Sequence, residues 1–505
     1  MTPIILTTLN ARYFHSSLGL RYLLANMGEL QEASAIHEFV IDARPIDIAE
    51  KLLLETPRII GLSVYIWNIE QATQLVALLK QVSPQTTIVL GGPEVSFEQE
   101  EQPIVAMADY VICGAAELEF AELCREVLAG CAPRRKIIHA LPFKLPQLKM
   151  PYDLYSDEDI ANRLIYVEAS RGCPFKCEFC LSALDKSAKA FDQTQFLEAM
   201  QRLFERGVRH FKFIDRTFNL KIKDSIRIME FFLARMSDGL FLHFELIPDH
   251  LPEALRAMIQ RFPEGTLQFE VGIQSFNPEV QALISRKQNN EKSAENLCWI
   301  RNHSHAHIHA DLIIGLPGED IESFAQGFNR LAALNPHEIQ VGILKRLRGT
   351  PLVRHTEQYE MRYNPNPPYN ILSTNQIDFF TMQRLNRFAR YWEMISNSGR
   401  FKKTMARLLA GDPFAHFMQL SDWLFAETGQ THRLALKRLF ELLHRYLTEA
   451  AGIHHDEATA LLREDHQISG LSSTPIFLIT QQSQQQKRST KRRLESRQAQ
   501  HRKAG

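Results

Sequence analysis

The chain has no long apolar run, few cysteines and no excess of either charge. None of its uninterrupted apolar stretches approaches the roughly 18 residues that a membrane-spanning helix needs. Basic and acidic residues number 58 each, so the net charge does not indicate a nucleic-acid or membrane partner. The opening segment MTPIILTTLNARYF leads directly into a strand-like pattern, so we expect no secretory signal peptide.

Disulfide bonds are not expected either. The 505 residues contain only seven cysteines, and three of them are clustered. This usage favours a reducing, cytoplasmic setting over a disulfide framework. We interpret the four scattered cysteines as small buried apolar side chains. They are Cys113, Cys124, Cys131 and Cys298.

The clustered cysteines form the most informative motif. Cys173, Cys177 and Cys180 follow the apolar run LIYVEAS with the spacing C-x3-C-x2-C, and no fourth cysteine lies nearby. Closed zinc and iron–sulfur sites normally take four protein ligands, whereas three thiolates can hold a [4Fe–4S] cluster with one iron left open. An open metal position is typical of chemistry rather than structure. The alternatives are a zinc site with a distant fourth ligand and an accidental grouping of free thiols.

Neighbouring residues favour the open cluster. Gly172 and Pro174 predict an irregular loop directly after a strand. The charge of Lys176 should lower the pKa of the thiols. Phe179 places an aromatic ring between the last two cysteines, where a planar base could stack.

The segment RGCPFKCEFC resembles the signature of the radical S-adenosylmethionine (SAM) superfamily. The resemblance implies that SAM binds the open iron through its amino and carboxylate groups. It also implies reductive cleavage of SAM to methionine and a 5′-deoxyadenosyl radical, with electrons from a donor such as flavodoxin or ferredoxin. Phe179 would contact the adenine. Members that transfer methylthio groups carry a second cysteine triplet in the first domain, which this sequence lacks.

Residues 1–135 alternate strand-like and helix-like segments. This rhythm predicts an α/β domain with a doubly wound parallel sheet, which binds ligands at the carboxyl ends of its strands. The loops expected there contain Ser63, Tyr65, Gly91, Gly92, Glu94, Gly114 and Glu117.

These loops are similar to those of the Rossmann-like cobalamin-binding domain that precedes many radical SAM domains. The resemblance implies that the seven loop residues contact cobalamin. Two features depart from the family pattern. The stretch DYVICGAAE differs from it at two positions, and the D-x-H-x-x-G motif is missing, because His15 lacks the preceding Asp and has the wrong spacing to Gly19. We therefore expect no histidine below the cobalt; a sheet that has lost cobalamin is the alternative.

A proline-rich connector over residues 136–160 leads to a second alternating region over residues 161–355. Its six strands suit the partial (β/α)6 barrel of TIM type that the superfamily resemblance implies, with the chemistry at the carboxyl ends of the strands. The resemblance further implies SAM contacts, although a plain GGE motif is absent. The residues concerned are Asp215, Glu270, Gln274 and Gly315. For Glu245 and Glu270 the alternative is an ion pair inside the barrel.

Two further groups of residues, one of histidines and one of basic side chains, are not assigned to the cofactor sites. Histidines alternate with other residues at positions 303, 305, 307 and 309, where a solvated or hydrogen-bonded strand edge is favoured over a metal site. Lys345 and Arg346 end the last strand and, together with Arg348, indicate an anionic group nearby.

Residues 366–480 form a helical domain by pattern. The first helix is expected to begin at a Ser373/Thr374 cap and to bury a stripe of Leu385, Phe388, Trp392 and Ile395. This region resembles an uncharacterised C-terminal domain of some cobalamin-type radical SAM proteins, and we interpret it as a cap over the barrel. The basic tail, residues 481–505, should be disordered and solvated, with RNA contact as the alternative.

Together these features predict a radical SAM enzyme, with cobalamin-dependent methylation of an unactivated carbon in a small, natural-product-like substrate as the favoured outcome. A cobalamin-independent cyclisation or rearrangement is the second hypothesis. A non-enzymatic, RNA-associated metal-binding protein is the third.

Overall fold

The computed structural model describes residues 2–478. The chain divides into two compact units. Of the described residues, the first contains 2–245, 345–354 and 363–370, and the second contains 246–344, 355–362 and 371–478. The basic tail predicted for residues 481–505 lies outside the described residues. None of the described helices is both long and apolar enough to cross a membrane.

The first unit begins with a six-stranded parallel sheet in the order β2-β1-β3-β4-β5-β6. Its strands are β1 (Ile4–Asn10), β2 (Ser34–Val40), β3 (Ile59–Ser63), β4 (Thr87–Gly91), β5 (Tyr110–Cys113) and β6 (Ile137–His139). Because β1 and β3 are buried along their whole length, both read in the sequence as nearly continuous apolar runs. The order reverses between β1 and β3, and such a switch point is where ligands bind sheets of this kind.

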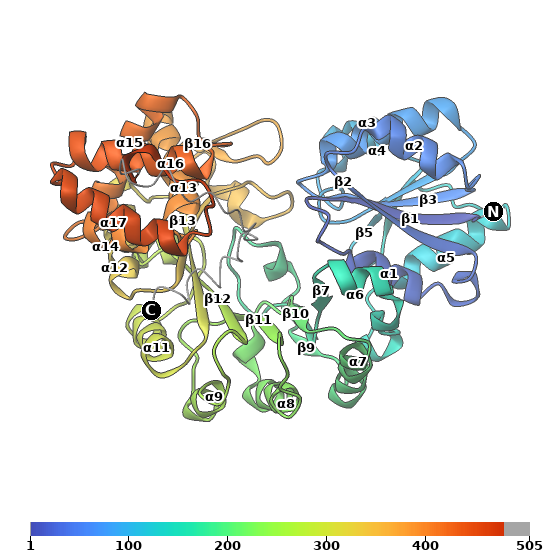
Figure 1. Ribbon diagram of the computed structural model, residues 1–505. Helices are drawn as coiled ribbons and strands as arrows, with labels where there is room; N and C mark the ends of the chain where they lie inside the picture. Colours follow the sequence, from blue (N-terminus) through green and yellow to red (C-terminus); the bar gives the residue numbers. More distant parts are fainter. Residues whose placement is uncertain (1, 479–505) are drawn as a thin grey trace. The chain divides into compact units, whose positions relative to one another are not determined.

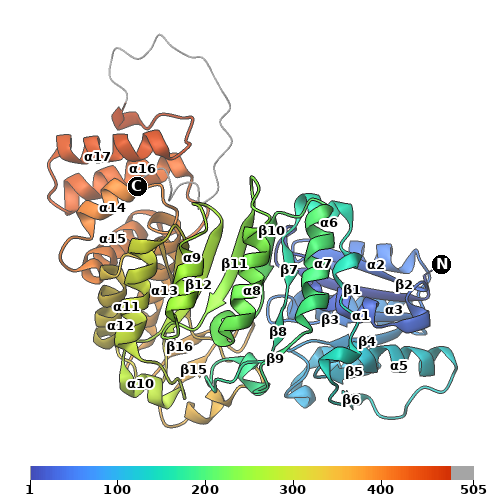
Figure 2. The ribbon, with the colours of Figure 1, turned by 90° about the horizontal axis from the view of Figure 1, so that it is seen from below.

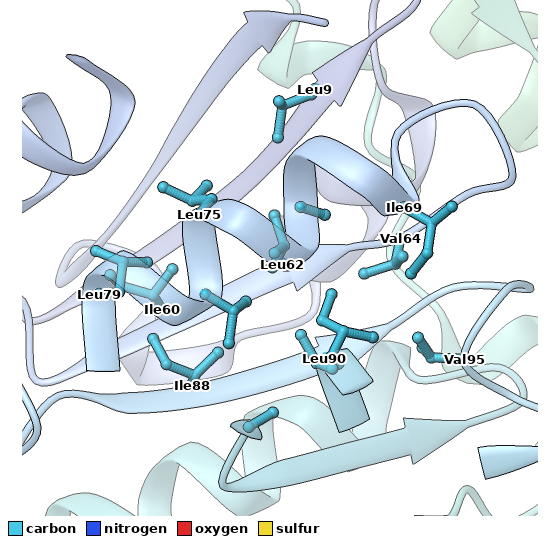
Figure 3. Packing of buried hydrophobic residues seen from close by; sticks show 14 of the residues in the cluster. Leu9, Ile60, Leu62, Val64, Ile69, Leu75, Leu79, Ile88, Leu90 and Val95 are labelled. Atoms are coloured by element: carbon cyan, nitrogen blue, oxygen red, sulfur yellow. The ribbon is translucent and has the colours of Figure 1, made fainter. Parts of the chain in front are cut away.

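Helices cover both faces of this sheet (Figure 1). One face carries α2 (Pro45–Leu53), α3 (Ile69–Val82) and α4 (Pro103–Met107), and the other carries α1 (Leu18–Ala25) and α5 (Glu117–Leu128). Figure 3 shows Leu75 and Leu79 of α3 in the apolar cluster that also contains strand residues Ile60, Leu62 and Ile88. The predicted doubly wound sheet is therefore confirmed.

The connector and the start of the second repeat region complete the first unit. Helix α6 (Asp157–Asn162) is followed by the parallel strands β7 (Ile165–Val167), β10 (His210–Phe213) and β11 (Phe241–Leu246), with α7 (Gln193–Glu205) and α8 (Ile222–Leu233) between them. Helix α8 packs on β10 through Phe232, whose ring contacts those of Phe211 and Phe213. Figure 2 shows the ribbons of α7 and α8 beside these strands. A short antiparallel pair, β8 (Ser170–Arg171) and β9 (Lys189–Ala190), flanks the cysteine loop.

The second unit continues the same rhythm with three parallel strands, β12 (Leu267–Gln274), β13 (His307–Ile314) and β14 (Glu338–Ile343). The helices among them are α9 (Glu253–Ile259), α10 (Pro278–Leu283), α11 (Asn290–His303) and α12 (Ile321–Ala333). With β7, β10 and β11, the chain has the six strand–helix repeats expected of a partial barrel. Two short strands follow, β15 (Arg362–Tyr363) and β16 (Ile371–Ser373).

The C-terminal region is helical, as predicted. It contains α13 (Phe379–Ile395), α14 (Lys402–Leu408), α15 (Pro413–Thr428), α16 (Leu436–Arg445) and α17 (His455–Ile468). The expected stripe of α13 is buried. The expected cap is wrong, because Asp378 caps α13 by accepting a hydrogen bond from the Thr381 N–H at 2.8 Å, while Ser373 belongs to β16.

The scattered cysteines differ in exposure. Cys113 and Cys124 are buried, as predicted, and Cys298 is half-buried. The prediction is wrong for Cys131, which is exposed because it directly follows Gly130 in the turn that ends α5.

Candidate active site

The three clustered cysteines lie on one loop between β8 and β9. Cys173 and Cys177 are buried and Cys180 is half-buried. The loop begins at Gly172, whose φ of +91° and close packing require glycine, since a Cβ there would lie 2.9 Å from the Ala188 nitrogen. The Cys173 N–H donates to the Asp185 carbonyl at 2.8 Å, which fixes the start of the loop.

The thiols lie within electrostatic reach of one another. Burial raises the pKa of the Cys173 thiol, the charges of Cys180 and Cys177 raise it further, and Arg216 lowers it. Arg216 follows β10 and also donates to the Glu245 carboxylate at 2.8 Å. Glu245 thus forms an ion pair, but its partner Arg216 is 52% exposed, so the pair is not inside the barrel as the alternative had it.

The donor set suits a cluster rather than a single ion. Among residues 2–478, no group of three or more His, Cys, Asp or Glu side chains is arranged to enclose one metal ion. A cubane makes a different demand, because each thiolate binds its own iron and the sulfurs need not converge on one point. Three sheltered thiols on a single irregular loop meet that demand.

Glu178 anchors the middle of the loop, and sequence reasoning missed it. Its buried carboxylate pairs with Arg354 at 2.5 Å, and its carbonyl accepts from the Leu352 N–H at 3.1 Å. The sequence around the cysteines does not distinguish Glu178 from the other residues between them. Its role depends on a segment more than 170 positions later in the chain.

Asp215 is tied to the strand end that leads into the cysteine loop. Its carboxylate accepts from the Ala169 N–H at 2.9 Å and from the Ser170 hydroxyl at 2.6 Å. Burial raises the pKa of this carboxyl to about 7, against the opposing effect of those two hydrogen bonds. Both oxygens are therefore engaged within the protein, and a direct contact of Asp215 with SAM stays a prediction.

The other residues expected to contact SAM lie in the second unit. Glu270 and Gln274 share the half-buried face of β12, and Gln274 ends the strand with a φ of +70°. The Gln274 amide folds over Gly272, where a Cβ would lie too close to its Nε2 atom. Gly315 follows β13 and packs against Ile371 with a φ of +88°. Their contacts with SAM stay predictions.

The carboxyl edge of the N-terminal sheet offers open surface at its switch point. The Tyr65 ring stacks on Trp67 with 4.3 Å between centroids, and Trp67 is 45% exposed. A Cβ at Gly91 or Gly114 would meet nothing nearer than 3.9 Å, so ligand atoms have access there. Gly92 is different, because its φ of +104° and its contact with the Val64 carbonyl leave no room for a side chain. The exposed Trp67 ring, stacked on the half-buried Tyr65, and the open glycines at this edge fit a large planar cofactor.

The two acidic residues expected at this edge have partners within the protein. Glu94 pairs with Arg348 at 3.0 Å and accepts from the Tyr369 hydroxyl at 2.9 Å. Glu117 pairs with Arg171, directly before the cysteine loop, at 2.5 Å. Arg346 pairs with Glu98, which also contacts Arg348. The anionic partners expected for these arginines are therefore carboxylates of the chain itself.

Two of the histidines named in the sequence analysis, His15 and His307, have partners within the protein. The His15 Nδ1 lies 2.5 Å from the Tyr166 hydroxyl, and burial lowers the pKa of His15. The His307 Nε2 lies 3.1 Å from the Glu338 carboxylate, and its ring stacks on that of His337. The hydrogen-bonded interpretation is thus confirmed for His307.

Comparison with protein families agrees with this architecture. Residues 167–331 match the radical SAM superfamily, so this part of the chain is a radical SAM domain. Residues 4–124 match the B12 binding domain, and residues 357–503 match a protein family of unknown function, DUF4080. The protein is thus a radical SAM enzyme with an N-terminal cobalamin-binding domain, and its cofactors are a [4Fe–4S] cluster, SAM and cobalamin.

Two curated proteins are similar to this chain in sequence. An uncharacterized methyltransferase of Pyrococcus horikoshii is 25% identical over 335 residues, which are 60% of this chain and 70% of that protein. The cobalamin-dependent radical SAM methyltransferase TokK of Streptomyces tokunonensis is 25% identical over 348 residues, 62% of this chain and 51% of TokK. The chain thus spans about half the length of TokK.

Solved structures share the fold. The radical SAM methyltransferase TsrM from Kitasatospora setae has a TM-score of 0.57 at 15% identity, over 72% of this chain and 79% of TsrM. The cobalamin-dependent radical enzyme OxsB has a TM-score of 0.61 at 13% identity, over 92% of this chain and 79% of OxsB.

Proposed function

We propose that this protein is a cobalamin-dependent radical SAM methyltransferase that acts on an unactivated carbon of a small molecule. One observation carries the proposal. The cysteine loop and the B12-type sheet belong to the same compact unit, and Arg171 joins them by pairing with Glu117 of α5 and with Glu168 at the end of β7, each at 2.5 Å. Such a link holds two cofactor sites at a fixed separation, which group transfer requires.

In this proposal Cys173, Cys177 and Cys180 would hold the cluster. When bound, the cluster and SAM supply a 5′-deoxyadenosyl radical, and cobalamin supplies the methyl group. The protein contributes placement. Phe179 would lie against the adenine, and Asp215 and Glu178 would fix the two sides of the loop. We further propose a reducing cytoplasmic setting and a small electron-transfer protein, such as flavodoxin or ferredoxin, as the donor.

The first test is anaerobic reconstitution of the full chain with iron and sulfide, followed by reduction in the presence of SAM. We expect the wild type to form 5′-deoxyadenosine. The Cys177→Ala variant should form none and should also lack the visible absorption of the cluster. Cys131→Ala is the matched control, because it removes an exposed thiol outside the loop. Normal SAM cleavage by Cys177→Ala would refute the assignment of the cluster.

The second test concerns cobalamin. After loading with hydroxocobalamin, the protein should retain the cobalamin absorption spectrum through gel filtration. Extracts of cells with and without the protein should then differ by a product that is heavier by one methyl group. SAM cleavage without cobalamin retention would reject the methyltransferase proposal and favour a cobalamin-independent radical reaction.

A further inference from the structure

The second unit contains a cavity that none of the candidate cofactor residues lines. It has a volume of about 700 Å³ and lies between strand β14 and helix α13, with α15 at one side. Its polar lining includes Gln340 of β14 and five residues of α13. These are Gln383, Asn386, Arg387, Arg390 and Glu393. The size is typical of a site for a small molecule.

Two arginines of α13 lie on this cavity without an acidic partner. Within residues 2–478, neither Arg387 nor Arg390 forms an ion pair, and Arg387 forms no hydrogen bond either. The contrast on the same helix is clear, since Arg384 pairs with Asp422 at 2.6 Å. Two cations three positions apart on a helix repel each other. A guanidinium that lines a cavity with its donors unused is therefore available to an anion.

Both guanidinium groups are held in place. The Arg387 guanidinium lies over the Phe425 ring, 4.3 Å from its centroid. The Arg390 Nε donates to the Thr431 carbonyl at 3.3 Å, which leaves its terminal amino groups free to bind. Because these side chains are already ordered, less conformational entropy is lost when a ligand binds.

Strand β14 adds backbone donors at the same place. The side chain of Asn397 bonds to both the N–H and the carbonyl of Ile339, at 3.1 and 2.9 Å, along the edge of β14 that faces away from β13. Peptide groups alternate between the two edges of a strand, so those of Val341 and Ile343 point the same way as those of Ile339. Both residues line the cavity.

We propose that this cavity binds an oxyanion, either the phosphate or the carboxylate group of a small molecule, between Arg387 and Arg390. Planar guanidinium groups match the geometry of both oxyanions and bind them through paired hydrogen bonds. Glu393 also lines the cavity, but it accepts from the Asn397 amide at 2.9 Å, and the two arginines outnumber it. The side-chain amides of Gln340 and Gln383 supply donors for the rest of the ligand. The Asn386 amide already donates to the Met382 carbonyl at 2.8 Å.

Calorimetric titration of the full-length protein tests the proposal, with pyrophosphate and citrate as separate probes and chloride at matched ionic strength as the blank. We expect saturable binding of at least one probe. Arg387→Gln and Arg390→Gln should each weaken it about 10-fold to 100-fold, as expected for a lost hydrogen bond to a charged group. The probe that binds more tightly identifies the chemical source of the anion.

Arg384→Gln is the matched control, because it removes a paired arginine from the same helix and should change the affinity less than about 2-fold. Arg387→Lys, which keeps the charge but loses the planar donors, should fall between the wild type and Arg387→Gln and guards against misfolding of the glutamine variant. No saturable binding of either probe would overturn the proposal. An equal loss of affinity in Arg384→Gln would also overturn the proposal, because the effect would then come from the total charge of the helix and not from a specific contact.

Discussion

At the scale of single residues, Gly349 shows how a missing side chain keeps two distant segments together. A Cβ at this position would collide with the Phe97 ring, and φ is +79°. Gly349→Ala should therefore displace the segment that carries Arg346 and Arg348 and break their ion pairs with Glu98. We expect a loss of about 1–3 kcal/mol in the free energy of unfolding of the first unit, measured by denaturant titration.

Gly239→Ala is the control for this substitution. Gly239 has the same φ of +79°, but a Cβ there would meet nothing within 4 Å, so this variant reports the backbone strain alone. An equal loss in both variants would show that the contact with Phe97 contributes nothing.

Asp215 gives a prediction of pH dependence. Because burial raises its pKa to about 7 from an ordinary value of 3.8, the folded state holds this proton over a range where the unfolded chain has released it. Its contribution to stability is therefore largest below about pH 4 and is lost as the pH rises towards 7. Asp215→Asn cannot titrate. The melting temperature of the wild type, relative to that of Asp215→Asn, should thus fall between pH 4.5 and 7.5, and a constant difference would contradict the prediction.

At the scale of elements, the pairing of Arg171 with Glu117 and Glu168 joins helix α5 to the start of the cysteine loop. The side chains of Glu117 and Glu168 are only 11% and 7% exposed. Arg171→Met would leave two sheltered carboxylates without their cation, so we expect a loss of about 3–5 kcal/mol in a denaturant titration. Adding Glu117→Gln should restore part of that loss.

Arg202→Met is the comparison for this pair, since Arg202 and Asp153 form an ion pair with side chains 50% and 62% exposed. It should cost less than about 1 kcal/mol. A loss in Arg171→Met no greater than this would mean that the link does not hold the two elements together.

The spacing of apolar residues predicted most of the helices and strands, because an element that is buried on one side carries apolar residues at regular intervals along its sequence. The buried stripe of α13 is an example. Its first residue could not be predicted in the same way, because Ser373, Thr374 and Asp378 are all good caps. Tertiary context selected Asp378. Helix α14 depends on still more distant context, since the carboxylate of Asp465 in α17 accepts from the N–H groups of Lys403 and Thr404.

At the scale of the whole molecule, some parts of the site depend on residues that are close in sequence, and others depend on residues that meet only after folding. The cysteine loop is local in sequence, so its spacing alone predicted a cluster. The contacts that fix it are not local, because Glu178 pairs with Arg354 only after folding. The same holds for Glu94 at the edge of the N-terminal sheet, which pairs with Arg348. The arginines at the end of the predicted barrel indicated an anionic group nearby, and that group consists of two carboxylates of the chain itself, Glu94 and Glu98. Charge in a sequence does not reveal its partner.

Binding of cobalamin should slow amide hydrogen exchange in a few loops of the N-terminal sheet and leave the exchange elsewhere unchanged. We expect hydroxocobalamin to slow amide exchange in the loops at residues 63–68, 91–98 and 113–117, because these follow β3, β4 and β5 at the carboxyl edge of the sheet. At 100 times the dissociation constant, binding can stabilise the folded state by about 2.7 kcal/mol, which sets the upper limit of the protection. Helices α16 and α17 serve as the internal control and should not change. Uniform slowing, or none, would refute cobalamin binding at this edge while leaving the cluster assignment untouched.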